Sequence, residues 1–195
     1  MAHHTGRRVN DQSPGPLRVV LTGSESVGKT TLAARLAAHF GVRWVPEFVR
    51  QYAETKGSAL EFADHGPIAR GQVAAEDTAL ADARVAGESL LLHDTDVVST
   101  VVYCHHYFGR CPAFLEELAR TRRADLYLVL DIDVPWVADG VRDRGDRRLE
   151  IHSQFIETLT RFDAPRLVIR GDWDARLQQS IQAIDRLISS SPSTD

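Results

Sequence analysis

The residues with the clearest chemical potential lie in one short segment, GSESVGKT at positions 23–30. The segment follows the apolar run LRVVLT and precedes the helical run TTLAARLAAHF, which is the strand, loop and helix order of a phosphate-binding loop. Its two glycines allow consecutive backbone N–H groups to point at anionic oxygens, and the helix adds the positive end of its dipole. We therefore expect the loop to bind the phosphates of ATP through Gly23, Ser24, Glu25, Ser26, Val27, Gly28, Lys29, Thr30 and Thr31.

Two side chains of this loop have expected roles of their own. Lys29 is one of only two lysines in the chain, and its ammonium is expected to contact the β- and γ-phosphates. The hydroxyl of Thr30 is expected to coordinate Mg²⁺. A guanine-specific switch would need an Asn-Lys-x-Asp segment. The single asparagine of the chain, Asn10, lies in the polar N-terminal stretch and is not part of such a segment.

Two carboxylates follow the predicted strand SLLLH, in the sequence His93-Asp94-Thr95-Asp96. Asp94 is expected to hold Mg²⁺ together with Thr30, and Asp96 to face the molecule that accepts the phosphoryl group. The structural alternative is that one of the two caps the helix that follows.

A third carboxylate, Glu47, follows the predicted strand VRWV and opens the segment PEFVRQY. It could accept a proton from a substrate hydroxyl or bind a ribose diol, while Arg50, one helical turn later, could contact substrate or phosphate. The alternative is a carboxylate stabilised by a helix dipole beside a solvated arginine.

Short apolar runs that alternate with amphipathic stretches predict an α/β fold, a parallel five-stranded sheet flanked by helices. In such a sheet the carboxyl ends of the strands share one edge, where ligands bind. The expected strands are 17–22, 42–45, 90–93, 126–130 and 167–169. The expected helices are 28–39, 47–55, 58–64, 67–86, 95–108, 112–122, 148–162 and 173–188.

Composition places this domain at residues 17–188, between loose polar tails at 1–16 and 189–195. With 43% hydrophobic and 26% charged residues and a net charge of −4, the chain is not expected to bind nucleic acid or a membrane. Its first residues contain no secretion signal, so we expect a cytoplasmic protein with free thiols at Cys104 and Cys111. Oligomeric state cannot be predicted from these patterns.

The phosphate loop, PEFVRQY, DTDVVSTVVYCHHYFG and LDIDVPWVADGVRDRGDRR together resemble the ribosylnicotinamide kinase domain of the bifunctional bacterial NAD-biosynthesis regulator. The resemblance covers roughly residues 17–188. It implies a P-loop kinase that transfers the γ-phosphoryl group of ATP to the 5′-hydroxyl of nicotinamide riboside. A kinase for another nucleoside or small polyol and an ATP-binding regulatory module are the alternatives. Nothing in the chain resembles the regulator's adenylyltransferase or DNA-binding regions, so we expect it to make the mononucleotide only.

The resemblance also implies roles for the site residues. Glu47, Asp94 and Asp96 would surround the ribose and the metal, and Trp136 and Asp139 would contact the nicotinamide side. Trp136 offers a flat face to a pyridinium cation, although it could instead pack beside Pro135.

The Arg-rich segment 142–148 fits the short lid of small kinases. Arg142, and after it Arg147 or Arg148, would stabilise charge on the transferring phosphoryl group. The alternative is a solvated run of charges.

The cluster Cys104, His105, His106 and Cys111 is not predicted to bind zinc. Neighbouring residues of a helix point about 100° apart, and this spacing matches no common structural zinc pattern.

Overall fold

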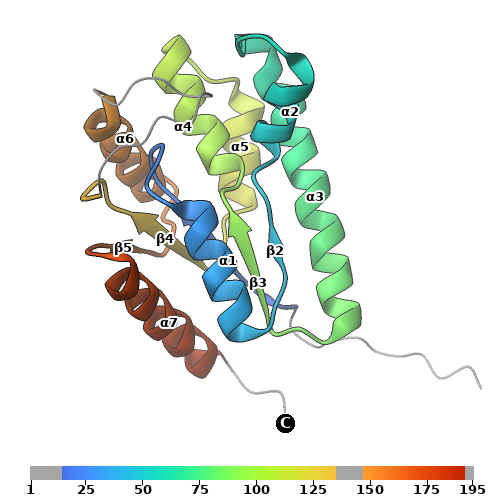
Figure 1. The fold of residues 1–195 in the computed structure, drawn as a ribbon. Helices are drawn as coiled ribbons and strands as arrows, with labels where there is room; N and C mark the ends of the chain where they lie inside the picture. Colours follow the sequence, from blue (N-terminus) through green and yellow to red (C-terminus); the bar gives the residue numbers. More distant parts are fainter. Residues whose placement is uncertain (1–14, 135–146, 192–195) are drawn as a thin grey trace, which may run out of the picture.

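A computed structural model describes residues 15–134 and 147–191. Their core is a parallel sheet of five strands in the order β2-β3-β1-β4-β5. The strands are β1 (Leu17–Thr22), β2 (Trp44–Val45), β3 (Leu90–Asp94), β4 (Leu126–Leu130) and β5 (Arg166–Ile169). All neighbouring pairs are parallel, so the carboxyl ends of the strands lie along one edge (Figure 1).

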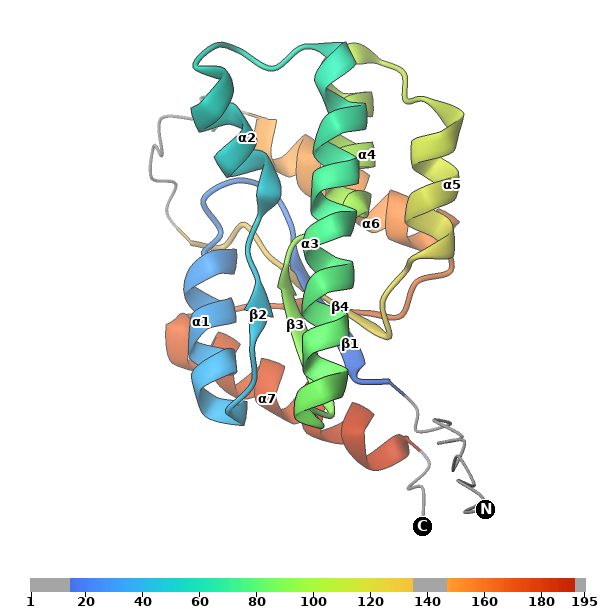
Figure 2. The same ribbon diagram turned by 90° about the vertical axis from the view of Figure 1, so that its right-hand side faces the viewer.

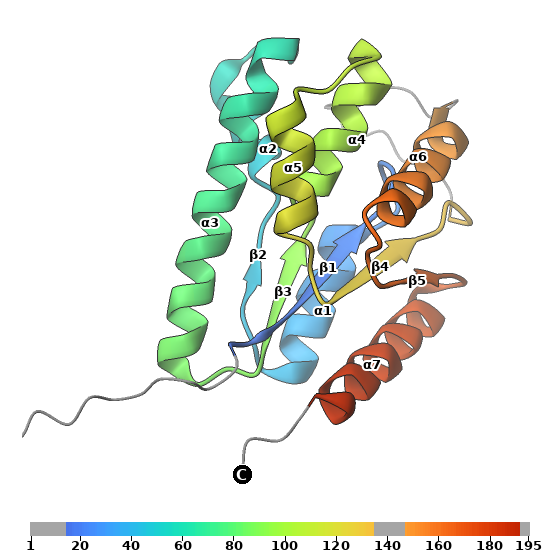
Figure 3. The ribbon, with the colours of Figure 1, turned by 180° about the vertical axis from the view of Figure 1, so that it is seen from behind.

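Helices cover both faces of this sheet. They are α1 (Lys29–Phe40), α2 (Phe48–Lys56), α3 (His65–Ala86), α4 (Val97–Phe108), α5 (Ala113–Thr121), α6 (Arg148–Arg161) and α7 (Trp173–Ser190). Helices α1 and α7 pack on one face, and α3, α4, α5 and α6 lie on the other (Figures 1 and 3). The expected five-stranded α/β fold is therefore confirmed.

Each face of the sheet has its own apolar core. Residues that alternate along β1 divide between them: Val19 and Leu21 pack toward α1 and α7, whereas Val20 packs toward α4 and α6. Strand β3 is buried along its whole length, as a central parallel strand covered on both faces must be. Burial of each such Val or Leu side chain contributes roughly 1.5–3 kcal/mol, which makes the sheet a rigid base for the loops at its edge.

The sequence predicted two segments wrongly. Residues 58–61 of the expected helix 58–64 are not helical, and only Phe62–Asp64 forms a single 3₁₀ turn, η1. Gly57 ends α2, and the Asp64 carboxylate then accepts hydrogen bonds from the Glu61 N–H at 2.7 Å and the Tyr52 hydroxyl at 2.8 Å. These bonds hold an irregular connection above β2 (Figure 2). The expected strand 42–45 is reduced to its last two residues.

The boundaries of the remaining elements agree with expectation within a few residues. Helix α7 reaches Ser190, two residues beyond the predicted end of the domain. Among the described residues, no helix is both long and apolar enough to cross a membrane.

Candidate active site

The phosphate loop joins β1 to α1 at the carboxyl edge of the sheet. Gly23 has φ 133° and Gly28 has φ 85°, conformations that L side chains rarely adopt. A Cβ on Gly23 would approach the carbonyl oxygen of Leu130 to 2.8 Å, and one on Gly28 would approach the indole of Trp173 to 2.2 Å. Both glycines are therefore required by backbone conformation and by space.

Lys29 is buried at the first position of α1. Its Nζ donates hydrogen bonds to the carbonyl oxygens of Gly23 at 3.1 Å and Ser24 at 2.8 Å. The ammonium therefore contacts the backbone of its own loop. A phosphate oxygen bound in the loop would compete with these two carbonyl oxygens for the hydrogen bonds of Lys29.

Asp94 lies beside this loop because β3 is the neighbour of β1, and in this register Asp94 is paired with Leu21. The Thr30 hydroxyl donates a 2.5 Å hydrogen bond to Oδ2 of Asp94. The other oxygen, Oδ1, is buried without a hydrogen-bond partner among the described residues. Burial raises the pKa of the Asp94 carboxyl, while nearby Lys29 and the Thr30 hydroxyl act to lower it.

A hydroxyl and a carboxylate with an unsatisfied buried oxygen fit a magnesium ion. Mg²⁺ prefers oxygen ligands and usually keeps several of its waters. Thr30 and Asp94, the expected pair, are the residues that would hold it. Asp94 is not the cap of α4, so the structural alternative for this residue does not apply.

Asp96 caps α4 instead. Its Oδ1 accepts a 2.9 Å hydrogen bond from the N–H of Val98, and its Oδ2 accepts a 2.6 Å bond from the hydroxyl of Tyr127. Burial raises the pKa of this carboxyl to about 6. Between the two aspartates, Thr95 has φ 70°, an unfavourable conformation for a β-branched residue, which strains the link between Asp94 and the helix cap Asp96.

Glu47 and Arg50 approach the same edge from α2. Glu47 precedes α2 but makes no cap hydrogen bond with its side chain, which is only 6% exposed. Its carboxylate lies 3.7 Å from Nη2 of Arg50. The charge of Glu47 raises the pKa of Asp94 and that of Arg50 lowers it, so both residues are electrostatically coupled to the Asp94 carboxylate.

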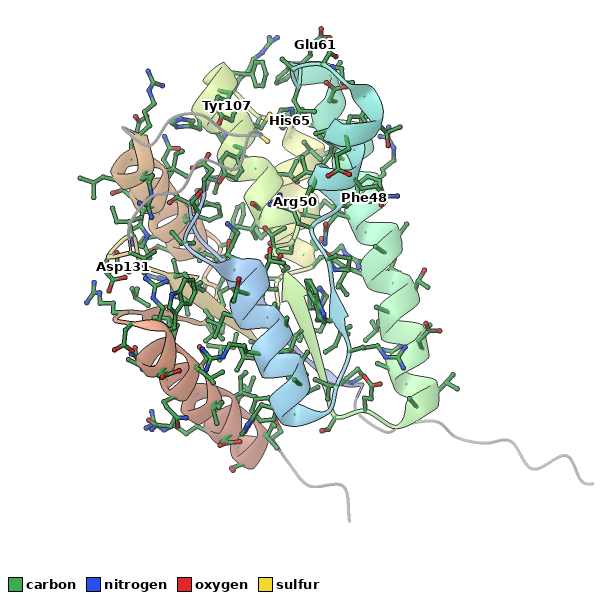
Figure 4. The ribbon with its side chains drawn as sticks, viewed as in Figure 1. Phe48, Arg50, Glu61, His65, Tyr107 and Asp131 are labelled. Carbon is green, nitrogen blue, oxygen red and sulfur yellow. The ribbon has the colours of Figure 1, made fainter. Side chains whose placement is uncertain are left out.

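A cavity of about 720 Å³ opens next to these carboxylates, between α2, α3 and α4. Thr95 and Asp96 line it, one and two positions after Asp94, whereas Lys29, Glu47 and Asp94 do not. The rings of Tyr103 and Tyr107 stack with centroids 6.0 Å apart, and both line the cavity. Figure 4 labels Tyr107 and His65, which line the cavity, and Arg50 of α2.

One important residue was not predicted from the sequence. Arg176 of α7 is fully buried and donates to the carbonyl oxygens of Val27 and Asp131, both at 2.9 Å. It also pairs with the Asp133 carboxylate. Arg176 thus fastens the phosphate loop to the end of β4. Its sequence context, DWDARLQQS, is that of an ordinary solvated helix and gives no signal of this role.

Of the expected lid, only its end is described. Arg147 directly precedes α6. Arg148 is buried, and its Nη1 donates to the Val134 carbonyl oxygen at 3.2 Å. The buried Glu25 carboxylate of the phosphate loop acts to raise the pKa of Arg148, although desolvation lowers it overall. Trp136, Asp139 and Arg142 lie outside the described residues.

This fold, with a glycine-dependent phosphate loop beside the hydrogen-bonded Thr30 and Asp94, defines a P-loop nucleotide-binding domain. The chain belongs to a family of such domains, described as "AAA domain", whose model matches residues 18–176.

The chain is 31% identical over 177 residues to the trifunctional NAD biosynthesis/regulator protein NadR of Escherichia coli (strain K12). It is 29% identical to the NadR protein of Salmonella typhimurium (strain LT2) over the same length. Each match covers 87% of this chain and 42% of the relative. The chain therefore spans less than half the length of these curated relatives.

Solved structures share the fold. A NadR protein in complex with NR has a TM-score of 0.74 at 24% identity, covering 91% of this chain and 53% of that one. Thymidylate kinase from Ehrlichia chaffeensis has a TM-score of 0.65 at 15% identity, covering 88% of this chain and 100% of that one.

Proposed function

We propose that the chain is an ATP-dependent kinase that phosphorylates the 5′-hydroxyl of nicotinamide riboside to give nicotinamide mononucleotide. The observation that carries the proposal is the Thr30 and Asp94 pair, which lies beside the phosphate loop and next to an aromatic cavity for an acceptor. The 31% identity to a NAD biosynthesis protein supports this choice of acceptor.

The donor half of the reaction rests on the phosphate loop. ATP would displace the Gly23 and Ser24 carbonyls from Lys29, whose ammonium would then neutralise charge on the β- and γ-phosphates. Thr30 and Asp94 would hold Mg²⁺, which supplies further neutralisation of the phosphates when bound. Arg176 keeps the loop in place through the Val27 carbonyl, so the N–H groups need no rearrangement to receive the phosphates.

The acceptor half rests on the cavity. Its volume of about 720 Å³ lies within the range of roughly 300–1,000 Å³ that small-molecule sites occupy. The aromatic rings of Tyr103, Tyr107 and Phe108 line it, together with the carboxylates of Glu54 and Asp96. A fixed pyridinium cation gains cation–π attraction to aromatic faces and Coulomb attraction to carboxylates, whereas a neutral base can stack on the rings but gains neither charge interaction.

Glu47 is the better candidate to accept the hydroxyl proton. Both oxygens of Asp96 already accept hydrogen bonds that support α4 and β4, whereas Glu47 does not cap its helix. Glu47 also lies close enough to Asp94 to raise its pKa, as a residue at the reacting centre should. Asp96 would then bind the ribose from the inner wall of the cavity, and Arg50 would orient Glu47.

The roles that the resemblance implies for the remaining residues stay part of the proposal. Trp136 and Asp139 contact the nicotinamide side, and Arg142 and Arg147 stabilise charge on the transferring phosphoryl group. A cytoplasmic location is consistent with the reaction, since ATP is supplied there.

A coupled assay of ADP release across a panel of nucleosides and small polyols tests the proposal. The expected result is Mg²⁺-dependent ADP release with nicotinamide riboside, with a 5′-monophosphate identified as product by mass spectrometry. Turnover of a different member of the panel would indicate another kinase of this fold. Slow ATP hydrolysis that no acceptor accelerates would indicate a regulatory module.

A further inference from the structure

Three side chains of metal-binding type meet where α4 is followed by α5, outside the phosphate and acceptor sites. They are Nε2 of His105, Sγ of Cys111 and a carboxylate oxygen of Glu116, and these atoms all lie within 4.8 Å of one another. His105 is in the last turn of α4, Cys111 in the connection, and Glu116 in the first turn of α5. Among the described residues, this is the group of three His, Cys, Asp or Glu side chains whose possible ligand atoms lie close enough together to hold one metal ion.

The connection brings the three together through its own backbone. Gly109 ends α4 with φ 64°, and Pro112 precedes α5 and accepts a 2.9 Å hydrogen bond from the N–H of Leu115. The thiol of Cys104 donates to the Arg110 carbonyl oxygen at 3.3 Å, which holds the turn against α4. The arrangement of the donor atoms is therefore built into the fold before any ligand arrives.

The donor set fits zinc. Imidazole, thiolate and carboxylate are the usual ligands of Zn²⁺, and a tetrahedral shell with bonds of about 2.0–2.3 Å has edges of roughly 3.3–3.8 Å. In the structure His105 Nε2 and Oε1 of Glu116 are hydrogen-bonded at 2.6 Å, so an ion would replace this bond and move the two atoms apart to such an edge. Binding would release the proton of the Cys111 thiol to solvent, and the resulting thiolate together with one carboxylate would balance the charge of the ion.

The cluster is open to solvent on one side. The side chains of His105 and Glu116 are 36% and 32% exposed, which leaves a path for an ion and room for a water molecule as fourth ligand. Glu116 also has Arg161 at 3.7 Å, but that arginine is half exposed and can turn to solvent when the carboxylate binds an ion.

The site differs from the cluster that the sequence excluded. His106 Nδ1 faces the amide oxygen of Gln154 at 3.2 Å, away from Cys111, as expected for a residue adjacent to His105 on a helix. The sequence argument treated Cys104, His105, His106 and Cys111 as one set of four ligands. It could not include Glu116, which comes from a different helix.

We infer that His105, Cys111 and Glu116 form a binding site for a single zinc-like divalent cation, with water completing the tetrahedron. The ion ties the end of α4, whose Tyr107 and Phe108 line the acceptor cavity, to the start of α5. This inference does not depend on the proposed kinase activity, because Thr30 and Asp94 take no part in the site.

Titration of the nucleotide-free chain with Co²⁺, followed by absorption spectroscopy, tests the inference. One equivalent of Co²⁺ should give thiolate-to-cobalt charge transfer and tetrahedral d–d bands, and one equivalent of Zn²⁺ should abolish them. Cys111→Ser should remove the charge-transfer band, and Glu116→Gln should weaken Co²⁺ binding at least about tenfold.

Two matched variants serve as controls. Cys104→Ser removes the other thiol, and Glu117→Gln removes the neighbouring exposed carboxylate of α5, so both should retain the cobalt spectrum. The thiolate band also separates this site from metal taken up by His3 and His4 near the N-terminus. Absence of the band at one equivalent of Co²⁺, or its persistence in Cys111→Ser, would overturn the inference.

A second measurement needs no substitution. Zn²⁺ should slow the alkylation of Cys111 by iodoacetamide in the unmodified chain, as measured by mass spectrometry. An unchanged rate at saturating Zn²⁺ would contradict the site even where the Cys111→Ser variant fails to fold.

Discussion

The hydroxyl of Thr30 and the carboxylate of Asp94 are joined by a 2.5 Å hydrogen bond, although 64 residues separate them in the chain. Parallel pairing of β1 with β3 places the start of α1 and the end of β3 side by side. One oxygen of Asp94 remains buried without a hydrogen-bond partner among the described residues. A cation between these two residues would satisfy that oxygen.

Replacement of Asp94 by Asn tests this pair. The amide keeps the size of the side chain and can still accept from Thr30, but it removes the negative charge that a Mg²⁺ ligand needs. We expect Mg²⁺-dependent activity to fall at least about a hundredfold while the thermal unfolding temperature changes little. Unchanged rate and Mg²⁺ dependence would mean that Asp94 has a structural role only.

Lys29→Ala should lower kcat at least about a hundredfold without unfolding the chain. Lys29 donates hydrogen bonds to the carbonyl oxygens of Gly23 and Ser24 in its own loop and would act on phosphate charge, not on the core. Steady-state kinetics and circular dichroism measure the two effects. A folded variant with near-normal turnover would remove this loop from the catalytic site.

Gly28→Ala should destabilise the fold far more than Gly41→Ala. Both glycines have positive φ, 85° and 65°, so both substitutions carry a backbone cost of roughly 1 kcal/mol. Only the Cβ at position 28 meets another residue, at 2.2 Å from the Trp173 indole, while nothing lies within 4 Å at position 41.

The clash adds about 1–3 kcal/mol, as overpacking does, and Trp173→Ala in the same chain should relieve part of it. Urea denaturation of the two single variants and the double variant gives the coupling free energy. Equal stability losses at positions 28 and 41 would contradict the close contact.

A buried carboxyl outside the reacting centre makes stability depend on pH. Burial in the presence of the Asp96 charge raises the pKa of Glu76 from 4.5 to about 7. Between these values the folded chain binds more protons than the unfolded chain, so the free energy of unfolding should fall as pH rises from about 4.5 to 7. Above pH 7 Glu76 is ionised in both states, and its contribution to the free energy of unfolding no longer changes with pH.

Glu76→Gln should flatten this dependence and raise the free energy of unfolding at pH 8 by up to about 3 kcal/mol, since the pKa rises from 4.5 to about 7 and each pKa unit corresponds to about 1.4 kcal/mol. Asp77→Asn is the matched control, because Asp77 pairs with the same Arg122 from an exposed position. Equal pH profiles for the wild type and Glu76→Gln would show that Glu76 titrates normally.

The fold and the position of the phosphate loop beside Asp94 could be predicted because their signals are local. The apolar strand before Gly23 and the carboxylate directly after β3 are visible in the sequence, and parallel topology alone brings them together. The Glu47 segment could be placed at the same edge for the same reason.

What could not be predicted depends on contacts between distant segments. Asp96 caps α4 through the Val98 N–H, while its second oxygen accepts from the hydroxyl of Tyr127 on β4, a contact that the sequence does not indicate. Arg176 is buried because loop carbonyls and Asp133 surround it, an environment that no spacing in the sequence reveals. The aromatic wall of the cavity arises from the way α4 faces α2 and α3, which helical periodicity does not determine.

The acceptor is the central claim, and kcat/KM for competing nucleosides tests it most directly. The cavity combines the stacked rings of Tyr103 and Tyr107 with the carboxylates of Glu54 and Asp96, an environment that favours a fixed cation. With saturating MgATP, we predict that kcat/KM for nicotinamide riboside exceeds that for uridine, cytidine and adenosine by at least about tenfold, which corresponds to about 1.4 kcal/mol. Equal or better kcat/KM for any of the three neutral nucleosides would contradict the assignment of nicotinamide riboside as acceptor.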